Sequence, residues 1–121
     1  MKKEIKEKTL RHIPADFDGV VFDLKSKLEN SCPKAKIISA AGMQDLETQE
    51  AGSVDMAVCL KLHKFDCDKA LDEIHRILKP DGTFIACLKP HEEFRTALKE
   101  KFHVNSYHTS EHYAYFEAQK K

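Results

Sequence analysis

Cysteine and histidine are the side chains best suited to chemistry in this sequence, and three of them have a spacing that suggests a metal site. Cys59, His63 and Cys67 recur every four residues, and zinc is commonly bound by these two residue types. However, Cys59 lies in an apolar run typical of a buried strand, His63 follows that run, and Cys67 lies where a helix begins. Because ligands on such different elements are not expected to converge, we predict no metal ligands.

A cysteine nucleophile and a histidine pair are the other candidates. A nucleophilic cysteine needs a neighbour that lowers its pKa, and none of the four cysteines has an obvious one. Without a CxxC pair these thiols are expected to stay free, with Cys59 and Cys87 as small buried residues. His108 and His112 flank a predicted turn and could bind a metal weakly, although exposed polar residues are common there. We predict no catalytic and no cofactor-binding residue.

Aromatic residues are concentrated near the end of the chain. Tyr107, Tyr113, Tyr115 and Phe116 fall on two predicted strands of a hairpin. Packing of these rings across the two strands is one interpretation. The alternative is an interaction surface, since exposed aromatic residues commonly anchor protein partners.

The elements that position these residues alternate between strand and helix. Apolar runs and turn residues predict the strands and helices of a mainly parallel sheet. The predicted strands are 19–23, 36–40, 54–60 and 83–88, and the predicted helices are 24–31, 66–78 and 90–102, with one helical turn at 44–48 and a tight turn at 79–82. Residues 103–108 and 112–118 form an antiparallel hairpin. The fold class is therefore a three-layer α/β sandwich with a mainly parallel sheet and a C-terminal antiparallel hairpin.

Size and charge limit the classes of function. At 121 residues the chain fits one domain, 1–121, with a charged N-terminal arm at 1–14 that is expected to be a short solvated helix or frayed. Its 20 basic and 20 acidic residues cancel, so the chain lacks the long-range field that attracts nucleic acid or an anionic membrane. The apolar runs are too short to cross a membrane, and the charged N-terminus does not resemble a signal peptide. We expect a cytoplasmic protein.

One long segment resembles a known family. Residues 52–87 contain Ser53-Val54-Asp55 at the start of a strand, Leu62-His63 after it, and the pattern Glu-Ile-x-Arg-Ile-Leu-Lys-Pro-x-Gly over 73–82. This segment is similar to the fourth and fifth strands of class I S-adenosylmethionine-dependent methyltransferases. The resemblance implies a truncated methyltransferase-like Rossmann fold, in which Glu73 and Arg76 can pair on the helix surface.

The upstream sequence departs from that family at the site of the methyl donor. A nucleotide-like ligand needs a glycine-rich turn after the first strand, so that the backbone can approach it. Here Asp23 stands where the family has an acidic residue, but 24–27 read Leu-Lys-Ser-Lys and the chain has four scattered glycines. Only twelve residues separate Asp23 from Lys36, too few for the additional strand and helix that would present an acid to the ribose. Where the family often has an acidic residue that contacts adenine, this chain reads Ala40-Ala41-Gly42, and Asp45 could take that role from a shifted position. We therefore predict no bound cofactor.

Such a shortened fold resembles the N-terminal domain of the anamorsin family, which acts in cytosolic iron–sulfur protein assembly. The matching residues are Val20-Val21-Phe22-Asp23, Ser53-Val54 and the segment 76–83. The resemblance implies a non-catalytic protein-interaction domain that docks a diflavin reductase; the cysteine motifs that hold the clusters of that family are not found in this sequence. The alternatives are a divergent methyltransferase with an incomplete or partner-completed donor site, and a fragment without activity of its own.

Overall fold

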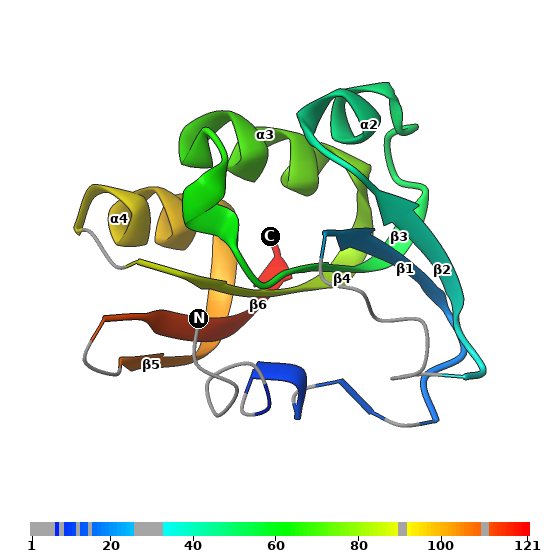
Figure 1. Cartoon of the computed structure of the whole chain (residues 1–121), viewed down its shortest axis with the longest axis horizontal. Helices are drawn as coiled ribbons and strands as arrows, with labels where there is room; N and C mark the ends of the chain where they lie inside the picture. Colours follow the sequence, from blue (N-terminus) through cyan, green and yellow to red (C-terminus); the bar gives the residue numbers. More distant parts are fainter. Residues whose placement is uncertain are drawn as a thin grey trace.

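A single six-stranded sheet organises the molecule (Figure 1). The computed structural model describes residues 7, 9–11, 13–14, 16–25, 33–89, 92–109 and 112–121. The elements are β1 Val20–Leu24, β2 Lys36–Ala40, α2 Met43–Thr48, β3 Val54–Cys59, the 3-10 helix η1 Leu62–Lys64, α3 Cys67–Ile77, β4 Leu78–Leu88, α4 Glu92–Lys101, β5 Phe102–Thr109 and β6 Ala114–Lys120. In the part of the chain that the structure describes, none of the helices has the length and apolar character that crossing a bilayer requires.

The order of the strands confirms the predicted fold class. The sheet runs β2-β1-β3-β4-β6-β5, and the pairs within β2-β1-β3-β4 are parallel. β6 is antiparallel to both β4 and β5, which gives the expected C-terminal hairpin. The carboxyl ends of the parallel strands consequently lie at the same edge of the sheet, the edge at which ligands bind in folds of this type.

Apolar side chains pack on both faces of the sheet because successive residues of a strand point to opposite sides. On one face lie α2, α3 and α4, as Figure 1 shows, and the core beneath them includes Phe22 and Phe84. The N-terminal segment lies along the other face (Figure 1), where Ile13 packs with Val21 and Met56. Helices, sheet and N-terminal segment thus form three layers.

The N-terminal arm is helical at Glu7, Thr9 and Leu10, as one of the two expectations had it, but it is not wholly solvated, because two of its described side chains are buried. Ile13 is 8% exposed and Thr9 is fully buried. The Thr9 hydroxyl group forms a hydrogen bond with the thiol of Cys87 on β4, which explains how a polar side chain is accommodated there. A few apolar and polar residues anchor this segment although charged residues dominate its sequence.

The helix α3 confirms the clearest helical prediction. Asp66 caps its N-terminus by accepting a hydrogen bond from the backbone N–H of Lys69, with an N···O distance of 3.2 Å. Its buried residues recur with helical spacing and face the sheet; they are Ala70, Leu71, Ile74 and Ile77. The helix predicted at 24–31 lies almost entirely outside the described residues.

The region between α3 and the core of β4 differs from the prediction. A turn was expected at 79–82 with a strand from 83, but β4 already begins at Leu78, which pairs with Val54. The next paired residues are Thr83 and Met56, so four residues bulge out within the strand. Gly82 is required in this bulge because a Cβ atom there would lie 2.8 Å from the Lys79 carbonyl oxygen. Turn residues therefore produce a bulge in β4 and do not delay its start.

Candidate functional site

The carboxyl ends of β1 and β2 form the place where a methyl donor would be expected. Asp23 is only 2% exposed and the following Leu24 is 1% exposed. The acidic side chain that matches the family motif is therefore buried in the fold, and so is the first residue that replaces the glycine-rich turn. Asp23 also lies close enough to Cys59 to contribute to the raised pKa of that thiol.

The backbone after β1 turns within two residues of Asp23. Lys25 adopts a φ of 58°, in the left-handed region that glycine normally occupies. Its N–H donates a hydrogen bond to the Ala40 carbonyl oxygen at the end of β2, over 3.1 Å. This amide is consequently engaged inside the fold. Lys25 itself is exposed, while Ser26 and Lys27, the rest of the predicted filled bend, lie outside the described residues.

Asp45, considered from the sequence as a displaced adenine contact, has another partner. It lies in the first turn of α2, and its Oδ2 atom accepts a hydrogen bond from the Ala41 N–H over 2.8 Å. The carboxylate thus holds the short connection between β2 and α2. Two backbone amides at this edge of the sheet, those of Lys25 and Ala41, are satisfied by groups of the chain itself.

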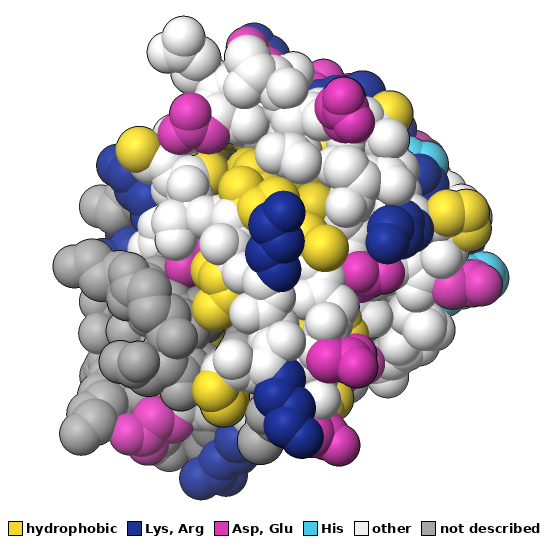
Figure 2. Space-filling model, turned by 90° about the vertical axis from the view of Figure 1, so that its right-hand side faces the viewer, with side chains coloured by type: hydrophobic (Ala, Val, Ile, Leu, Met, Phe, Trp, Pro, Cys, Tyr) yellow, Lys and Arg dark blue, Asp and Glu magenta, His cyan; other side chains and the backbone are white. Residues whose placement is uncertain are grey.

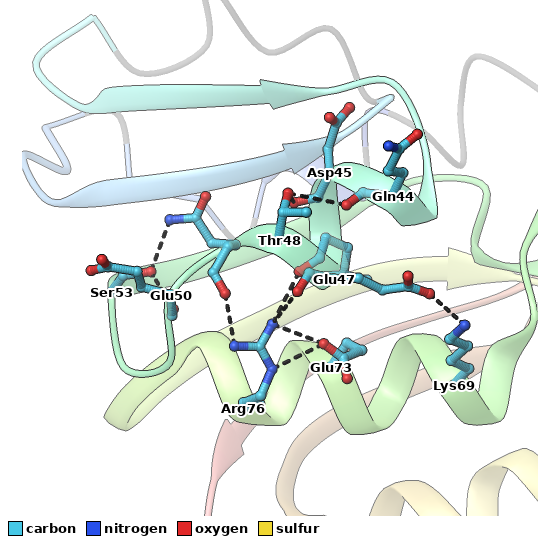
Figure 3. A network of polar contacts seen from close by, with 11 residues as sticks. Gln44, Asp45, Glu47, Thr48, Glu50, Ser53, Lys69, Glu73 and Arg76 are labelled. Carbon is cyan, nitrogen blue, oxygen red and sulfur yellow. Dashed lines mark hydrogen bonds and ion pairs between the residues drawn. The ribbon is translucent and has the colours of Figure 1, made fainter.

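Arg76 fixes the other end of α2. From α3 its guanidinium group points to the last turn of α2 and the residues after it (Figure 3), where Nη1 donates to the Gln49 carbonyl oxygen over 2.7 Å. Nη2 donates to the Leu46 and Glu47 carbonyl oxygens, both over 3.2 Å. These oxygens lie at the C-terminal end of α2, where a helix runs out of internal donors; the Leu46 oxygen also accepts from the Gln49 N–H over 3.3 Å. Arg76 therefore acts as a side-chain cap from a neighbouring helix.

The predicted ion pair on α3 is part of the same network. Arg76 Nε donates to Glu73 Oε2 over 2.9 Å, which confirms the expected i,i+3 pair. The three carbonyl contacts could not be read from the sequence. The residue type was the one available signal for these contacts. The planar guanidinium group of arginine carries several N–H donors and can contact several acceptors at once, which lysine does less well.

Asp55 plays a structural role at the opposite end of the strands. Its Oδ2 atom accepts a hydrogen bond from the Val20 N–H at the start of β1, over 2.8 Å. Its Oδ1 atom lies 3.4 Å from the Lys79 Nζ atom. Because this residue lies near the amino ends of the strands, it contributes to the register of β1 and is remote from the candidate site. Sequence analysis included Asp55 only as part of the family motif.

The described cysteines are poorly suited to nucleophilic chemistry. Burial raises the pKa of Cys59 to about 12 and that of Cys87 to about 11. Burial also raises the pKa of Cys67, and the nearby Asp68 and Asp66 raise it further. All three thiols are therefore protonated near neutral pH. Cys32 lies outside the described residues.

The histidine and cysteine positions singled out for metal binding do not assemble a ligand set. Among the residues that the structure describes, no three His, Cys, Asp or Glu side chains are placed to hold a metal ion. The thiol of Cys67 contacts the Leu62 carbonyl oxygen over 3.5 Å, and the His63 ring lies 5.7 Å from the ring of Tyr113. His108 stacks on Tyr115 with ring centroids 5.0 Å apart.

The aromatic residues of the hairpin pack across its two strands. Tyr107 stacks on Phe116 with ring centroids 6.1 Å apart, and the Cζ atom of Arg95 on α4 lies over the Tyr107 ring, 4.8 Å from its centroid. Burial raises the pKa of Tyr107, although Arg95 lowers it in part. Phe116 is fully buried. These contacts match the interpretation of cross-strand packing for Tyr107 and Phe116, whereas Tyr113 and Tyr115 are half-buried.

Solved structures with the same fold include several methyltransferases. One is an S-adenosylmethionine-dependent methyltransferase from Aquifex aeolicus, with 13% identity, a TM-score of 0.69 and coverage of 96% of this chain and 89% of that chain. A second is the Burkholderia thailandensis 1,6-didemethyltoxoflavin-N1-methyltransferase, with 15% identity, a TM-score of 0.68 and coverage of 98% and 77%. A third is the complex between the Haloferax volcanii Trm112 methyltransferase activator and a methyltransferase, with 14% identity, a TM-score of 0.65 and coverage of 94% and 88%.

The sequence itself matches a family model. No curated protein matches the chain, and the low identity to the solved structures limits their similarity to the fold. The model of a methyltransferase domain, however, matches residues 7–86. Because this match spans well over half of the 121 residues, the chain belongs to the methyltransferase-domain family.

Proposed function

We propose that this chain is a non-catalytic methyltransferase-like domain that works by binding a protein partner in the cytoplasm, and that residues 1–121 act as one domain. Two hydrogen bonds at the carboxyl ends of β1 and β2 support the proposal. There, Lys25 N–H donates to Ala40 and Asp45 accepts from Ala41 N–H. Groups that could have faced a donor molecule are thereby used within the chain, and the glycine-rich turn is replaced by larger residues.

Titration with the methyl donor tests this proposal. Isothermal calorimetry of the full chain with S-adenosylmethionine, and separately with S-adenosylhomocysteine, is expected to show no binding at micromolar concentrations. A donor-binding methyltransferase measured in the same buffer is the positive control. A Kd in the micromolar range for either compound would overturn the non-catalytic interpretation.

Two similarities support a protein partner. The methyltransferase solved with the Haloferax volcanii Trm112 activator forms a complex with that activator protein, so a domain of this fold is able to serve as one half of a protein complex. The resemblance to anamorsin-type domains points further, to a diflavin reductase in cytosolic iron–sulfur protein assembly. Surface plasmon resonance between the immobilised full chain and a purified diflavin reductase should give saturable binding, and its absence at micromolar concentrations would exclude this partner.

A divergent methyltransferase is the second candidate. It is favoured by the family match over residues 7–86 and by the methyltransferases of the same fold. In this alternative the donor site is completed by a partner, so S-adenosylmethionine would bind the complex but not the isolated chain. Repeating the calorimetric titration with the chain saturated by a bound partner separates the two functions.

A further inference from the structure

The segment between β2 and β3 has little apolar contact with the rest of the fold. From Ala41 to Ser53, a range that the structure describes in full, Leu46 is the only buried residue, and Met43 is partly buried against the same core. Figure 2 faces the side of the molecule that carries α2 and β2 in Figure 1, and it shows hydrophobic side chains as patches among polar and charged ones. A segment with so few buried apolar contacts has low local stability.

Two side chains of α3 supply polar contacts to this segment. Arg76 donates to three carbonyl oxygens at the end of α2 and just after it, and the Lys69 Nζ atom lies 2.5 Å from Glu47 Oε1 (Figure 3). The Lys69 side chain is 56% exposed and that of Glu47 is 38% exposed, and ion pairs in water contribute little to stability. Arg76 is therefore the stronger of the two attachments.

Glycines stand at both ends of the segment. A Cβ atom on Gly42 would meet nothing within 4 Å, so the backbone before α2 is not closely packed. Gly52 has a φ of 63°, a left-handed conformation that glycine adopts without strain. The Gly52 and Ser53 N–H groups donate to the Arg76 and Ile77 carbonyl oxygens over 3.0 and 2.8 Å. The base of the segment is thus fixed to the end of α3, and the backbone before Gly52 can move relative to it.

The contacts within the segment do not hold it in place without α3. α2 has six residues, and a helix of this length is unstable on its own in water. The Gln49 N–H donates to the Leu46 carbonyl oxygen over 3.3 Å, and the Asp45 N–H donates to the Gly42 carbonyl oxygen over 3.2 Å. These bonds are lost if α2 melts. The Asp45 carboxylate then also leaves the Ala41 N–H, which it accepts from over 2.8 Å in the folded helix.

We propose that residues 43–51 are a lid at the carboxyl end of β2, that the lid opens by melting of α2 while the sheet stays folded, and that Arg76 holds it closed. In the closed state the Ala41 amide and the Asp45 carboxylate bind each other. Opening releases both groups and exposes Leu46, so the state of the lid decides whether they are available at this end of the sheet. This inference goes beyond the proposed function and does not depend on whether the domain is catalytic.

Native-state hydrogen exchange of the isotope-labelled full chain tests this proposal. The three lid amides, those of Ala41, Asp45 and Gln49, should show equal protection, at least about a hundredfold lower than that of Val58 in β3. Urea below the unfolding transition should leave the protection of the lid amides nearly unchanged, because opening exposes little surface, and should reduce that of Val58. Lid amides that match Val58 in protection and in urea dependence would open only by global unfolding, which would overturn the proposal.

Two variants separate the role of Arg76 from a general loss of stability. Arg76→Met should lower the protection of the lid amides at least about tenfold, because the lost contacts exist only in the closed state. Ile85→Val changes the core on the opposite face of the sheet, which the open and closed states share. It should lower the protection of Val58 about three- to tenfold and leave the lid amides unchanged. Lid amides that respond to Ile85→Val as Val58 does, or that do not respond to Arg76→Met, would contradict the lid.

A third variant asks whether Arg76 in particular holds the lid closed. Lys69→Met removes the other side-chain attachment, and it should lower the protection of the lid amides by less than about threefold because this ion pair is exposed. An effect as large as that of Arg76→Met would overturn the assignment of this role to Arg76. None of these measurements uses S-adenosylmethionine or a reductase, so their outcome is separate from the tests of the proposed function.

Discussion

Replacing Arg76 with lysine separates the shape of its guanidinium group from its charge. The guanidinium group contacts the carbonyl oxygens of Leu46, Glu47 and Gln49 and the Glu73 carboxylate. Lysine keeps the positive charge, but one ammonium group cannot reproduce a planar set of donors that reaches several oxygens at once. The Arg76→Lys variant should therefore lose most of the contacts between α3 and the end of α2.

The magnitude follows from the number and exposure of these contacts. A hydrogen bond to a charged group contributes about 1.5–3 kcal/mol, but three such values cannot be added, because the carbonyl oxygens can bind water once the arginine is gone. The Arg76 side chain is also 34% exposed, and ordering it costs about 2 kcal/mol. We expect a loss in the free energy of unfolding of about 1–2 kcal/mol for Arg76→Lys and about 2–3 kcal/mol for Arg76→Met.

Thermal and urea denaturation measure this loss. For a chain of this length, 2 kcal/mol corresponds to a decrease of roughly 6–10 °C in the melting temperature. The matched control is Glu73→Gln, which removes only the partly exposed i,i+3 pair and should cost less than about 0.5 kcal/mol. The reasoning is refuted if Arg76→Lys is as stable as the parent protein, or if Glu73→Gln costs as much as Arg76→Lys.

Three other predictions concern the bulge, the register of β1 and the buried thiols. Gly82→Ala should destabilise the protein by about 1–3 kcal/mol in urea denaturation, because its Cβ would lie 2.8 Å from a backbone oxygen; Gly42→Ala, with nothing within 4 Å, should cost less than about 1 kcal/mol. Asp55→Ala leaves the Val20 N–H without the acceptor that it has at 2.8 Å and should cost about 1–2 kcal/mol, whereas Asp55→Asn retains an oxygen acceptor and should cost clearly less in the same assay. The Cys59 thiol, with its pKa raised from 9.0 to about 12, should react with iodoacetamide at pH 8 about a thousandfold more slowly in the folded than in the unfolded chain. Because the Cys59 thiolate is disfavoured in the folded chain only, the contribution of this thiol to the free energy of unfolding is complete below pH 9 and is lost as the pH rises from 9 towards 12. A Cys59→Ala variant should therefore lose less stability over that pH interval.

The sheet could be predicted from the sequence because its signals are local. Short apolar runs bounded by turn residues give strands, and the capping Asp66 with its periodic apolar residues gives α3. The start of β4 was missed because Pro80, Asp81 and Gly82 favour a turn, whereas the pairing of Leu78 with Val54 depends on a residue distant in the sequence. The burial of Thr9 likewise depends on Cys87, which a local pattern does not reveal.

The candidate site was predicted less completely, and for the same physical reason. The sequence showed that glycines are missing after Asp23 and that Asp45 is displaced from the family position. It did not show that the Asp45 carboxylate accepts from Ala41 N–H, because that contact requires α2 to begin close to the end of β2. It also showed the pairing of Glu73 with Arg76 without the carbonyl contacts of Arg76, which join segments about 30 residues apart.

The short connection between β2 and α2 sets which groups are available at the end of β2. Only Ala41 and Gly42 separate β2 from α2, so the acidic residue in the first turn of the helix comes to lie against the amide that follows the strand. The hydrogen bond between Asp45 and Ala41 withdraws both groups from a possible ligand. A longer connection could leave both groups free, because the helix would then begin farther from the strand. In the described part of this chain, the Lys25 and Ala41 amides at the ends of β1 and β2 are both engaged by hydrogen bonds within the chain. Neither amide is therefore free to donate to a small molecule beyond the strand ends.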